Sequence, residues 1–410
     1  MMFELFTSKR DCCGCGVCAS VCPKQAISMK KDAVGFHYPS IDHSLCVSCG
    51  LCKRSCAFQR ENSLYAPLQV YALARKNPDL LARSASGGLF SVLAERTLAG
   101  GGVVFGAAME PEGDTLVTRH RMASSPEELA LLRGSKYVQS SLGNTLQQTK
   151  QQLDSGKNVL FSGTPCQIAA LYAYLKKDYD NLLTVDLVCH GVPSAQMFQD
   201  YLRVLEQEYG GRITEFQFRY KNHDWGKDAR VCYRKADGTM ESRIIPRYDS
   251  SYYSYFFQNL IIRDSCHNCS YAGKQHPADL TAADFWGFEE VHPELMESRK
   301  ELDPNAGLSA LLVNTPKGAA VAAACLDQFY WADSTFEKVL VRNPRLASPN
   351  EPGVSRDAVL QLYAQRGYAA VERDFRQKKR NAAMRDQLHS YIARFVPKSI
   401  RAIVKQLLRR

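Results

Sequence analysis

The stretch that decides the N-terminal fold is Cys12-Cys-Gly-Cys-Gly-Val-Cys-Ala-Ser-Val-Cys-Pro23, and its cysteine spacing returns in Cys46-Val-Ser-Cys-Gly-Leu-Cys-Lys-Arg-Ser-Cys56. In each run, three cysteines are separated by two residues and a fourth follows after three more. Three thiolates at these gaps can surround one cubic iron–sulfur cluster, because the backbone between them forms a tight turn. Zinc sites, the main alternative, rarely place four cysteines within eleven residues. The two runs therefore predict two 4Fe-4S clusters.

The fourth cysteine of such a run usually binds the cluster of the other run. On this rule the first cluster takes Cys12, Cys15, Cys18 and Cys56, and the second takes Cys22, Cys46, Cys49 and Cys52. Cys13 is surplus, and we interpret it as a bystander thiol. Over residues 10–58 the paired runs, one with its trailing proline, resemble the bacterial two-cluster ferredoxins.

The cysteine distribution and the apolar pattern indicate a reducing compartment. Nine of the 15 cysteines lie between Cys12 and Cys56, at gaps that suit metal ligation better than disulfides. The sequence contains no run of about eighteen apolar residues, so no transmembrane helix is expected. The residues before Cys12 are too few and too mixed for an export signal. We therefore expect a cytoplasmic protein, whose 410 residues suggest two or three domains.

The net charge of +10 is concentrated near the C-terminal end. Residues 351–410 hold 14 Lys and Arg against 5 Asp and Glu, so the remainder is close to neutral and no nucleic-acid-binding surface is expected. Near the end, basic residues flank a helical apolar stripe formed by Ile400, Ile403, Val404, Leu407 and Leu408. This pattern is typical of a helix that makes peripheral contact with an anionic membrane or lies in a partner's groove. A helix packed on its own protein is the alternative.

Downstream of the cysteine runs the pattern indicates α/β units. After a loose connector around residues 59–67, a strand, a glycine-containing loop, a helix and another strand follow between residues 69 and 109. Residues 158–163 and 182–189 predict two more buried strands, joined by a helix that begins near Thr164. A right-handed crossover would make these two strands parallel.

Residues 212–262 alternate between polar and apolar positions and are rich in aromatic side chains. This favours antiparallel strands with a turn at Ala236-Asp-Gly238. The last sixty residues have a basic, helical pattern. The predicted fold is a multidomain α+β and α/β chain, with a small ferredoxin-like domain, an α/β body and a basic helical tail. We place its segments at residues 1–62, 68–150, 151–340 and 341–410.

Six short stretches beyond the cysteine runs occur in the order and spacing of a known family: Arg83–Gly88, Gly134–Ser140, Gly163–Gln167, Cys189–Gly191, Cys266–Cys269 and Ala283–Gly287. Between residues 69 and 317 the chain resembles the coenzyme F420 hydrogenase/dehydrogenase beta-subunit family. The resemblance implies FAD as the central cofactor and at least one further iron–sulfur cluster near it. It also implies electron transfer between the clusters, the flavin and a hydride-accepting partner, which makes the α/β body a flavin-binding body.

The chemistry of several residues agrees with a flavin site. Ser86, Gly87 and Gly88 open a predicted helix, where free backbone N–H groups suit a phosphate. Lys136 offers a cation for a pyrophosphate, and Tyr137 offers a ring for stacking. The resemblance adds three positions in the matched stretches: Gln139, Ser140 and Thr164. The alternative is that the glycines only turn the chain and that Tyr137 packs in a core.

Four further cysteines have metal-like placement: Cys166, Cys189, Cys266 and Cys269. The first two each follow the carboxyl end of a predicted parallel strand, where ligands of α/β sheets gather. Cys166 also lies in the first turn of a helix, where the dipole lowers the pKa of a thiol. The resemblance places a cluster with such residues, so we assign the four to a third 4Fe-4S cluster. Buried core thiols are the alternative, and they are our interpretation of Cys232 and Cys325.

These features favour an iron–sulfur flavoprotein oxidoreductase. It would pass electrons from ferredoxin or another one-electron partner through the clusters and FAD to a small substrate or a deazaflavin. The alternative is an electron-transfer subunit of a larger hydrogenase or dehydrogenase complex, and a redox sensor would need an output domain for which only the tail could serve. His190 and His267, beside the cysteines, are candidates for hydrogen bonds to sulfur. No catalytic acid or base can be named from the sequence.

Overall fold

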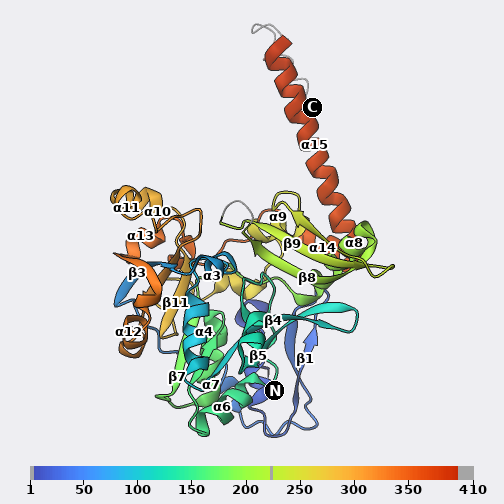
Figure 1. Ribbon diagram of the computed structural model, residues 1–410. Helices are drawn as coiled ribbons and strands as arrows, with labels where there is room; N and C mark the ends of the chain where they lie inside the picture. The colour runs from blue at the N-terminus through green and yellow to red at the C-terminus, as the bar shows by residue number, and fades with distance from the viewer. Residues whose placement is uncertain (1–3, 222–224, 396–410) are drawn as a thin grey trace.

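A mixed eight-stranded sheet organises the body of the chain in the computed structural model, which describes residues 4–221 and 225–395 (Figure 1). In spatial order the strands are β13 (Phe329–Ser334), β3 (Gln69–Arg75), β12 (Ser309–Val313), β11 (Leu280–Asp284), β7 (Leu182–Leu187), β6 (Val159–Ser162), β4 (Val103–Glu112) and β5 (Thr115–Ala123). The central strands β11, β7, β6 and β4 are parallel. The β6–β7 pairing confirms the predicted crossover, and the mixed α/β architecture confirms the expected fold class.

Helices cover both faces of the sheet. Successive residues of a buried strand point to opposite faces, so apolar side chains on each face pack against their own helices. Leu160 packs in a core with α4 (Leu89–Ala99), whereas its neighbour Phe161 packs with α6 (Thr145–Asp154) and α7 (Pro165–Leu175). A capping box between Thr164 and Gln167 starts α7. Shorter helices lie in the connections: α3 (Pro78–Ala82), α5 (Pro126–Leu132), α10 (Phe288–Val291), α11 (Pro293–Ser298), α12 (Pro316–Ala323), α13 (Phe336–Leu340), η3 (Leu326–Gln328) and η4 (Pro344–Leu346).

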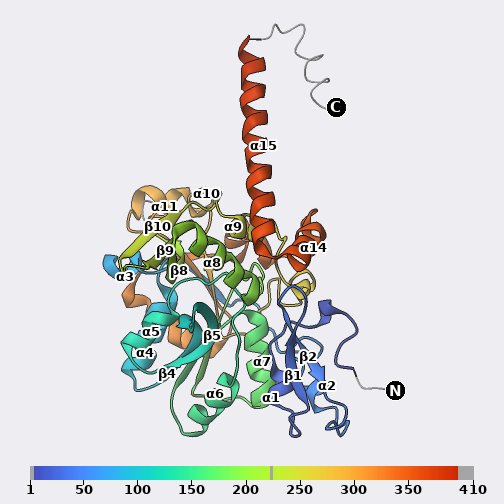
Figure 2. The same ribbon diagram turned by 90° about the vertical axis from the view of Figure 1, so that its right-hand side faces the viewer.

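The N-terminal cysteine module packs directly on this body. It contains η1 (Lys9–Asp11), α1 (Val17–Ser20), α2 (Leu51–Arg54) and the antiparallel pair β1 (Ile27–Lys31) and β2 (His37–Ile41). Val17 and Ala57 share one hydrophobic core with Phe161 of the sheet, and α1 lies beside α7 (Figure 2). The connector that we expected to be loose also pairs with the body, since Tyr65 and His276 exchange backbone hydrogen bonds.

A separate three-stranded antiparallel sheet contains β8 (Gly211–Tyr220), β9 (Asp228–Lys235) and β10 (Met240–Ile245). β9 and β10 form the predicted hairpin around Ala236-Asp-Gly238. Alternate residues of the strands, such as Phe216 and Val231, are buried in a core with α8 (Ala195–Tyr209) and α9 (Ser251–Phe257). This one-sided burial explains the alternation in the sequence.

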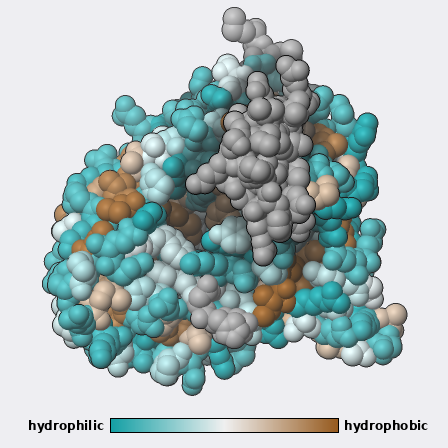
Figure 3. Space-filling view, turned by 90° about the horizontal axis from the view of Figure 1, so that it is seen from above, coloured by the Kyte–Doolittle hydropathy of each residue, from teal (hydrophilic) through white to brown (hydrophobic). Residues whose placement is uncertain are grey.

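The long helix α15 (Tyr368–Phe395) follows α14 (Arg356–Arg366) and projects away from the body (Figures 1 and 2). Its first turn is anchored, since Tyr368 and Val371 are buried in the core of the three-stranded sheet. The predicted apolar stripe, residues 400–408, lies outside the described residues. None of the helices within residues 4–221 and 225–395 combines the length and the hydropathy of a membrane-spanning segment. The face shown in Figure 3 is largely hydrophilic, with separate hydrophobic patches.

Candidate iron–sulfur sites

Cysteines from both N-terminal runs line one small cavity: Cys22, Cys46, Cys49 and Cys52. Ile27 of β1 and Ile41 of β2 line its apolar side. Gly50, with φ of +69°, caps α2 and turns the chain between two of the cysteines, a conformation that glycine adopts without a Cβ clash. The structure thus brings together the four residues predicted for the second cluster, including Cys22 from the other run.

Three of the four residues predicted for the first cluster, Cys12, Cys18 and Cys56, are also neighbours. Burial raises the pKa of Cys18 to about 12, and the nearby Cys12 and Cys56 thiols add to the rise. Cys56 likewise adds to the raised pKa of Cys12. The remaining predicted ligand, Cys15, makes a sulfur contact with Cys13. Cys56, from the second run, therefore lies beside cysteines of the first run, as expected if the fourth cysteine of each run binds the cluster of the other run.

A further cavity lies where the module meets the carboxyl edge of the large sheet, and five cysteines line it: Cys13, Cys166, Cys189, Cys266 and Cys269. Because β6 and β7 are neighbouring parallel strands, Cys166 at the start of α7 and Cys189 after β7 meet at the same edge. The 3-10 helix η2 (Asp264–Asn268) carries Cys266, and Cys269 follows it directly. The structure brings together the four predicted ligands and adds Cys13, which we had interpreted as a bystander.

Burial makes these thiols hard to ionise on their own. It raises the pKa of Cys266 and Cys269 to about 12 and that of Cys189 well above its ordinary value. The pKa of Cys166 is also raised, first by a hydrogen bond with the Cys13 thiol and then by burial. Both effects act against the lowering that we expected from the helix N-terminus. Bound iron would supply the positive charge that favours the thiolate forms.

Unpaired hydrogen-bond donors accompany the cysteines. His276 and Arg345 line the same cavity, and His276 Nε2 and Arg345 Nη1 are buried without a partner in the described chain. His276 Nδ1 lies 3.1 Å from Asp186 Oδ2. Such donors fit an anionic cluster, whose sulfur atoms accept hydrogen bonds. Within the described residues, no three or more His, Cys, Asp or Glu side chains converge on a single metal-ion position.

The two histidines next to these cysteines bond to the backbone. His190 Nε2 lies 3.2 Å from the Phe256 carbonyl oxygen, and burial lowers the His190 pKa to about 4. His267 Nδ1 lies 2.8 Å from the Asn350 carbonyl oxygen. Neither ring forms a hydrogen bond with a cysteine sulfur of the described residues. An effect of these histidines on the reduction potential of a cluster therefore stays a prediction.

Lys136 and Tyr137, which we predicted at the flavin, are engaged elsewhere. Lys136 Nζ donates to the carbonyl oxygens of Leu131, Leu132 and Arg133 at the end of α5, at 2.7 to 3.1 Å. Burial lowers the Lys136 pKa to about 7. The Tyr137 ring packs in a core of aromatic side chains: Phe218, Tyr253, Phe256 and Phe257. Tyr137 therefore packs as a core residue, which was the alternative to stacking on a flavin ring.

The glycine-containing loop is also occupied by contacts within the protein. Ser86 Oγ donates to the Leu308 carbonyl oxygen at 2.7 Å, and the Gly87 N–H donates to Ser309 Oγ at 2.9 Å. Gly88 caps α4 with φ of +86°, a left-handed conformation that suits glycine. The loop thus ties α4 to β12 and leaves the Gly87 N–H engaged.

The last three residues predicted for FAD lie nearer the cysteines. Gln139 Nε2 donates to the Cys13 carbonyl oxygen at 2.8 Å, and Ser140 Oγ lies 2.9 Å from His120 Nδ1. Thr164 lines the five-cysteine cavity and its hydroxyl lies 3.2 Å from the Cys166 sulfur. Of the eight residues predicted for FAD, Thr164 lines the five-cysteine cavity, and the other seven line neither of the two cysteine cavities. FAD at these residues stays a prediction.

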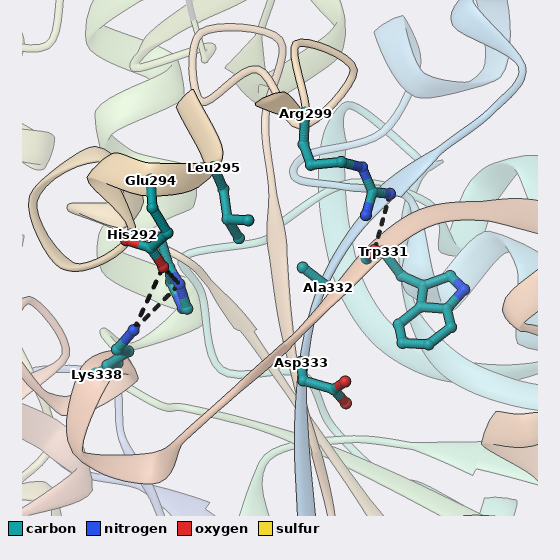
Figure 4. Close-up of a pocket in the computed structure, with 8 residues that line it drawn as sticks. All are labelled: His292, Glu294, Leu295, Arg299, Trp331, Ala332, Asp333 and Lys338. Atoms are coloured by element: carbon teal, nitrogen blue, oxygen red, sulfur yellow. Dashed lines mark hydrogen bonds and ion pairs between the residues drawn. The ribbon is translucent and has the colours of Figure 1, made fainter. Parts of the chain in front are cut away.

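Another recess, on the β13 edge of the sheet, contains no cysteine (Figure 4). His292 Nδ1 lies 3.0 Å from Glu294 Oε1 and 3.2 Å from Lys338 Nζ. Across the recess, Arg299 Nη2 donates to the Trp331 carbonyl oxygen at 3.0 Å. These charged groups bond to one another and to the backbone, and the recess is separate from the predicted cluster sites.

Known proteins resemble the chain over most of its length. Residues 70–147 and 156–337 match the models for the N-terminal and C-terminal parts of the coenzyme F420 hydrogenase/dehydrogenase beta subunit, and residues 11–59 match a 4Fe-4S dicluster domain. A chain of the xenon-derivatised F420-reducing NiFe hydrogenase complex from Methanosarcina barkeri is similar at 16% identity and a TM-score of 0.42, over 77% of this chain and 94% of that one. Curated proteins give no match. The chain therefore belongs to the coenzyme F420 hydrogenase/dehydrogenase beta-subunit family, a family of oxidoreductases, and carries a 4Fe-4S dicluster domain at its N-terminal end.

Proposed function

We propose that this protein is an iron–sulfur electron-transfer subunit. Its N-terminal clusters take single electrons from ferredoxin or another one-electron donor and pass them to a third 4Fe-4S cluster, bound by Cys166, Cys189, Cys266 and Cys269. The observation that carries the proposal is the cavity in which cysteines of the module and of the sheet edge meet. Each 4Fe-4S cluster changes by one electron, so such a chain conducts electrons without proton or group transfer.

Cys13 provides the contact between the two parts of the route. It follows Cys12, a predicted ligand of the first cluster, and its sulfur contacts both Cys15 and Cys166. Cys13 is only 7% exposed, so this path does not cross solvent. In each step the first cluster is oxidised by one electron and the third cluster is reduced by one.

FAD, which the family resemblance implies, has no step in this proposal. The residues expected to hold it already bond to other parts of the protein, as Lys136 does at the end of α5. A bound flavin would supply the junction between one-electron and hydride transfer. The residues described above support one-electron exchange, and we therefore assign hydride exchange with coenzyme F420, after which the family is named, to a partner subunit.

The test is anaerobic reduction of the purified full-length chain by two different donors. Reduced ferredoxin should reduce all three clusters, with the third cluster last in freeze-quenched electron paramagnetic resonance spectra. Reduced coenzyme F420 alone should leave the clusters oxidised. Rapid cluster reduction by reduced coenzyme F420, in a preparation with stoichiometric flavin, would overturn this proposal in favour of a reductase that binds its own two-electron substrate.

A further inference from the structure

One arginine connects the two parts of the chain that carry the predicted clusters. Arg263 stands three residues before Cys266, and its side chain is fully buried. Its Nε donates to the Cys12 carbonyl oxygen at 2.8 Å, and its Nη2 donates to the His37 carbonyl oxygen at 2.8 Å. Nη2 also lies 3.8 Å from Cys12 Sγ, and Nη1 donates to Gln139 Oε1 at 3.2 Å. The guanidinium thus reaches from the start of η2 into the Cys12 loop of the module.

The surroundings of this guanidinium are tight and largely apolar. Its central carbon lies 4.2 Å from the centre of the Tyr38 ring and 5.4 Å from that of the Phe36 ring. A Cβ at position 14 would lie 2.7 Å from Arg263 Nη1, and Gly14 has φ of +70°. A glycine is therefore needed where the cysteine loop passes the arginine. Charges in such a water-poor site interact more strongly than at the surface.

Arg263 has no carboxylate within ion-pair distance in the described chain, unlike its buried neighbour Arg356, which pairs with Asp264 at 2.5 Å. A buried cation without a counter-charge is strongly unfavourable. The anions available to Arg263 are a cluster bound through Cys12, whose sulfur lies 3.8 Å from Nη2, and a cluster in the five-cysteine cavity, which Arg263 also lines.

We propose that Arg263 is the positioning residue of the junction between the first and third clusters: it fixes the Cys12 loop on the body, and its charge stabilises the reduced state of both clusters. The inference rests on the proposed function. Reduction adds one negative charge to a cluster, and a fixed cation in a dry site favours the more negative state. Arg263 thereby raises the reduction potentials of both clusters.

The test is a redox titration of full-length variants, followed by electron paramagnetic resonance, with iron and sulfide measured on the same samples. Arg263→Gln removes the charge and should lower both potentials, with a change of at least about tenfold in each one-electron reduction equilibrium, which is about 59 mV. Arg263→Lys keeps the charge and should recover most of the shift. Arg356→Lys is the matched control: it changes the neighbouring buried arginine but keeps the positive charge that pairs with Asp264, so it should leave both potentials unchanged.

A second variant keeps the proposal testable if Arg263→Gln does not fold or does not bind its clusters. Gln139→Glu places a carboxylate where the Gln139 Oε1 atom lies 3.2 Å from Arg263 Nη1, so it should also lower both potentials. Unchanged potentials at full iron content, or a fall confined to one cluster, would overturn the shared role of Arg263. A wild-type protein without the third cluster would instead overturn the proposed function, and its iron content reveals this before any potentials are compared.

Discussion

The second N-terminal site and the five-cysteine cavity gather cysteines in different ways. In the N-terminal site all four cysteines lie between Cys22 and Cys52, around short turns such as the one at Gly50. The cavity instead takes cysteines from positions between 13 and 269, which meet because the module, β6, β7 and η2 pack together. A local site depends on a short stretch of backbone, whereas an assembled site depends on the whole tertiary structure. The two sites should therefore respond differently to mutation.

The largest effect should come from removing one ligand of the local site. Cys49→Ser should lose the second cluster, about four of about twelve iron atoms, and retain the third. The reason is that Cys49 lines only the N-terminal cavity. Iron analysis and Mössbauer spectroscopy measure both outcomes, and Cys232→Ser in β9 is the control. Joint loss of the second and third clusters would contradict the independence of the local site.

Cys13→Ala should change the rate of electron transfer and leave the iron content unchanged. The Cys13 sulfur contacts Cys15 and Cys166 but is not among the predicted ligands, so transfer from the first to the third cluster should slow. Stopped-flow reduction with ferredoxin measures this step. The matched control is Cys325→Ala, which removes a thiol that is also buried but lies outside both cavities. A loss of about four iron atoms would instead identify Cys13 as a ligand.

The same contrast explains how much could be predicted from the sequence. Ligand spacing is a local property, so the two N-terminal sets could be written down from the cysteine runs alone. The third set needed the family resemblance as well, because nothing local connects Cys166 with Cys266. Arg263 could not be predicted as a partner of Cys12, which is 251 residues away. The residues expected at FAD were judged by their chemistry, and the tertiary contacts that engage them are not visible in the sequence.

Lys136→Met tests whether Lys136 stabilises the end of α5, through the free energy of unfolding. The free energy of unfolding should fall by about 1–3 kcal/mol, because three carbonyl oxygens at the end of α5 lose their donor. Any flavin in the wild-type preparation should remain in the variant. Denaturant unfolding and the fluorescence of extracted flavin measure the two effects. Flavin loss at unchanged stability would support the pyrophosphate role that we first expected for Lys136.

The smallest effect should be a pH dependence of the assembled site. Burial lowers the pKa of His276, but the Asp186 carboxylate more than offsets this, and the pKa is raised overall. The stability from this pair is therefore present in full below the unfolded-state pKa of about 6.5 and is lost as pH rises through the higher folded-state pKa. The difference in unfolding free energy between wild type and His276→Gln should shrink over that range. A difference that grows with pH would contradict the pairing.

The central claim is that the five-cysteine cavity holds a third cluster, and the most direct measurement is iron and acid-labile sulfide per chain in anaerobically reconstituted protein. The account predicts about twelve of each in the wild type and about eight of each in Cys266→Ser, with Mössbauer spectra that show the two N-terminal clusters intact. About eight of each in both proteins would contradict it, because the cavity would then hold no cluster.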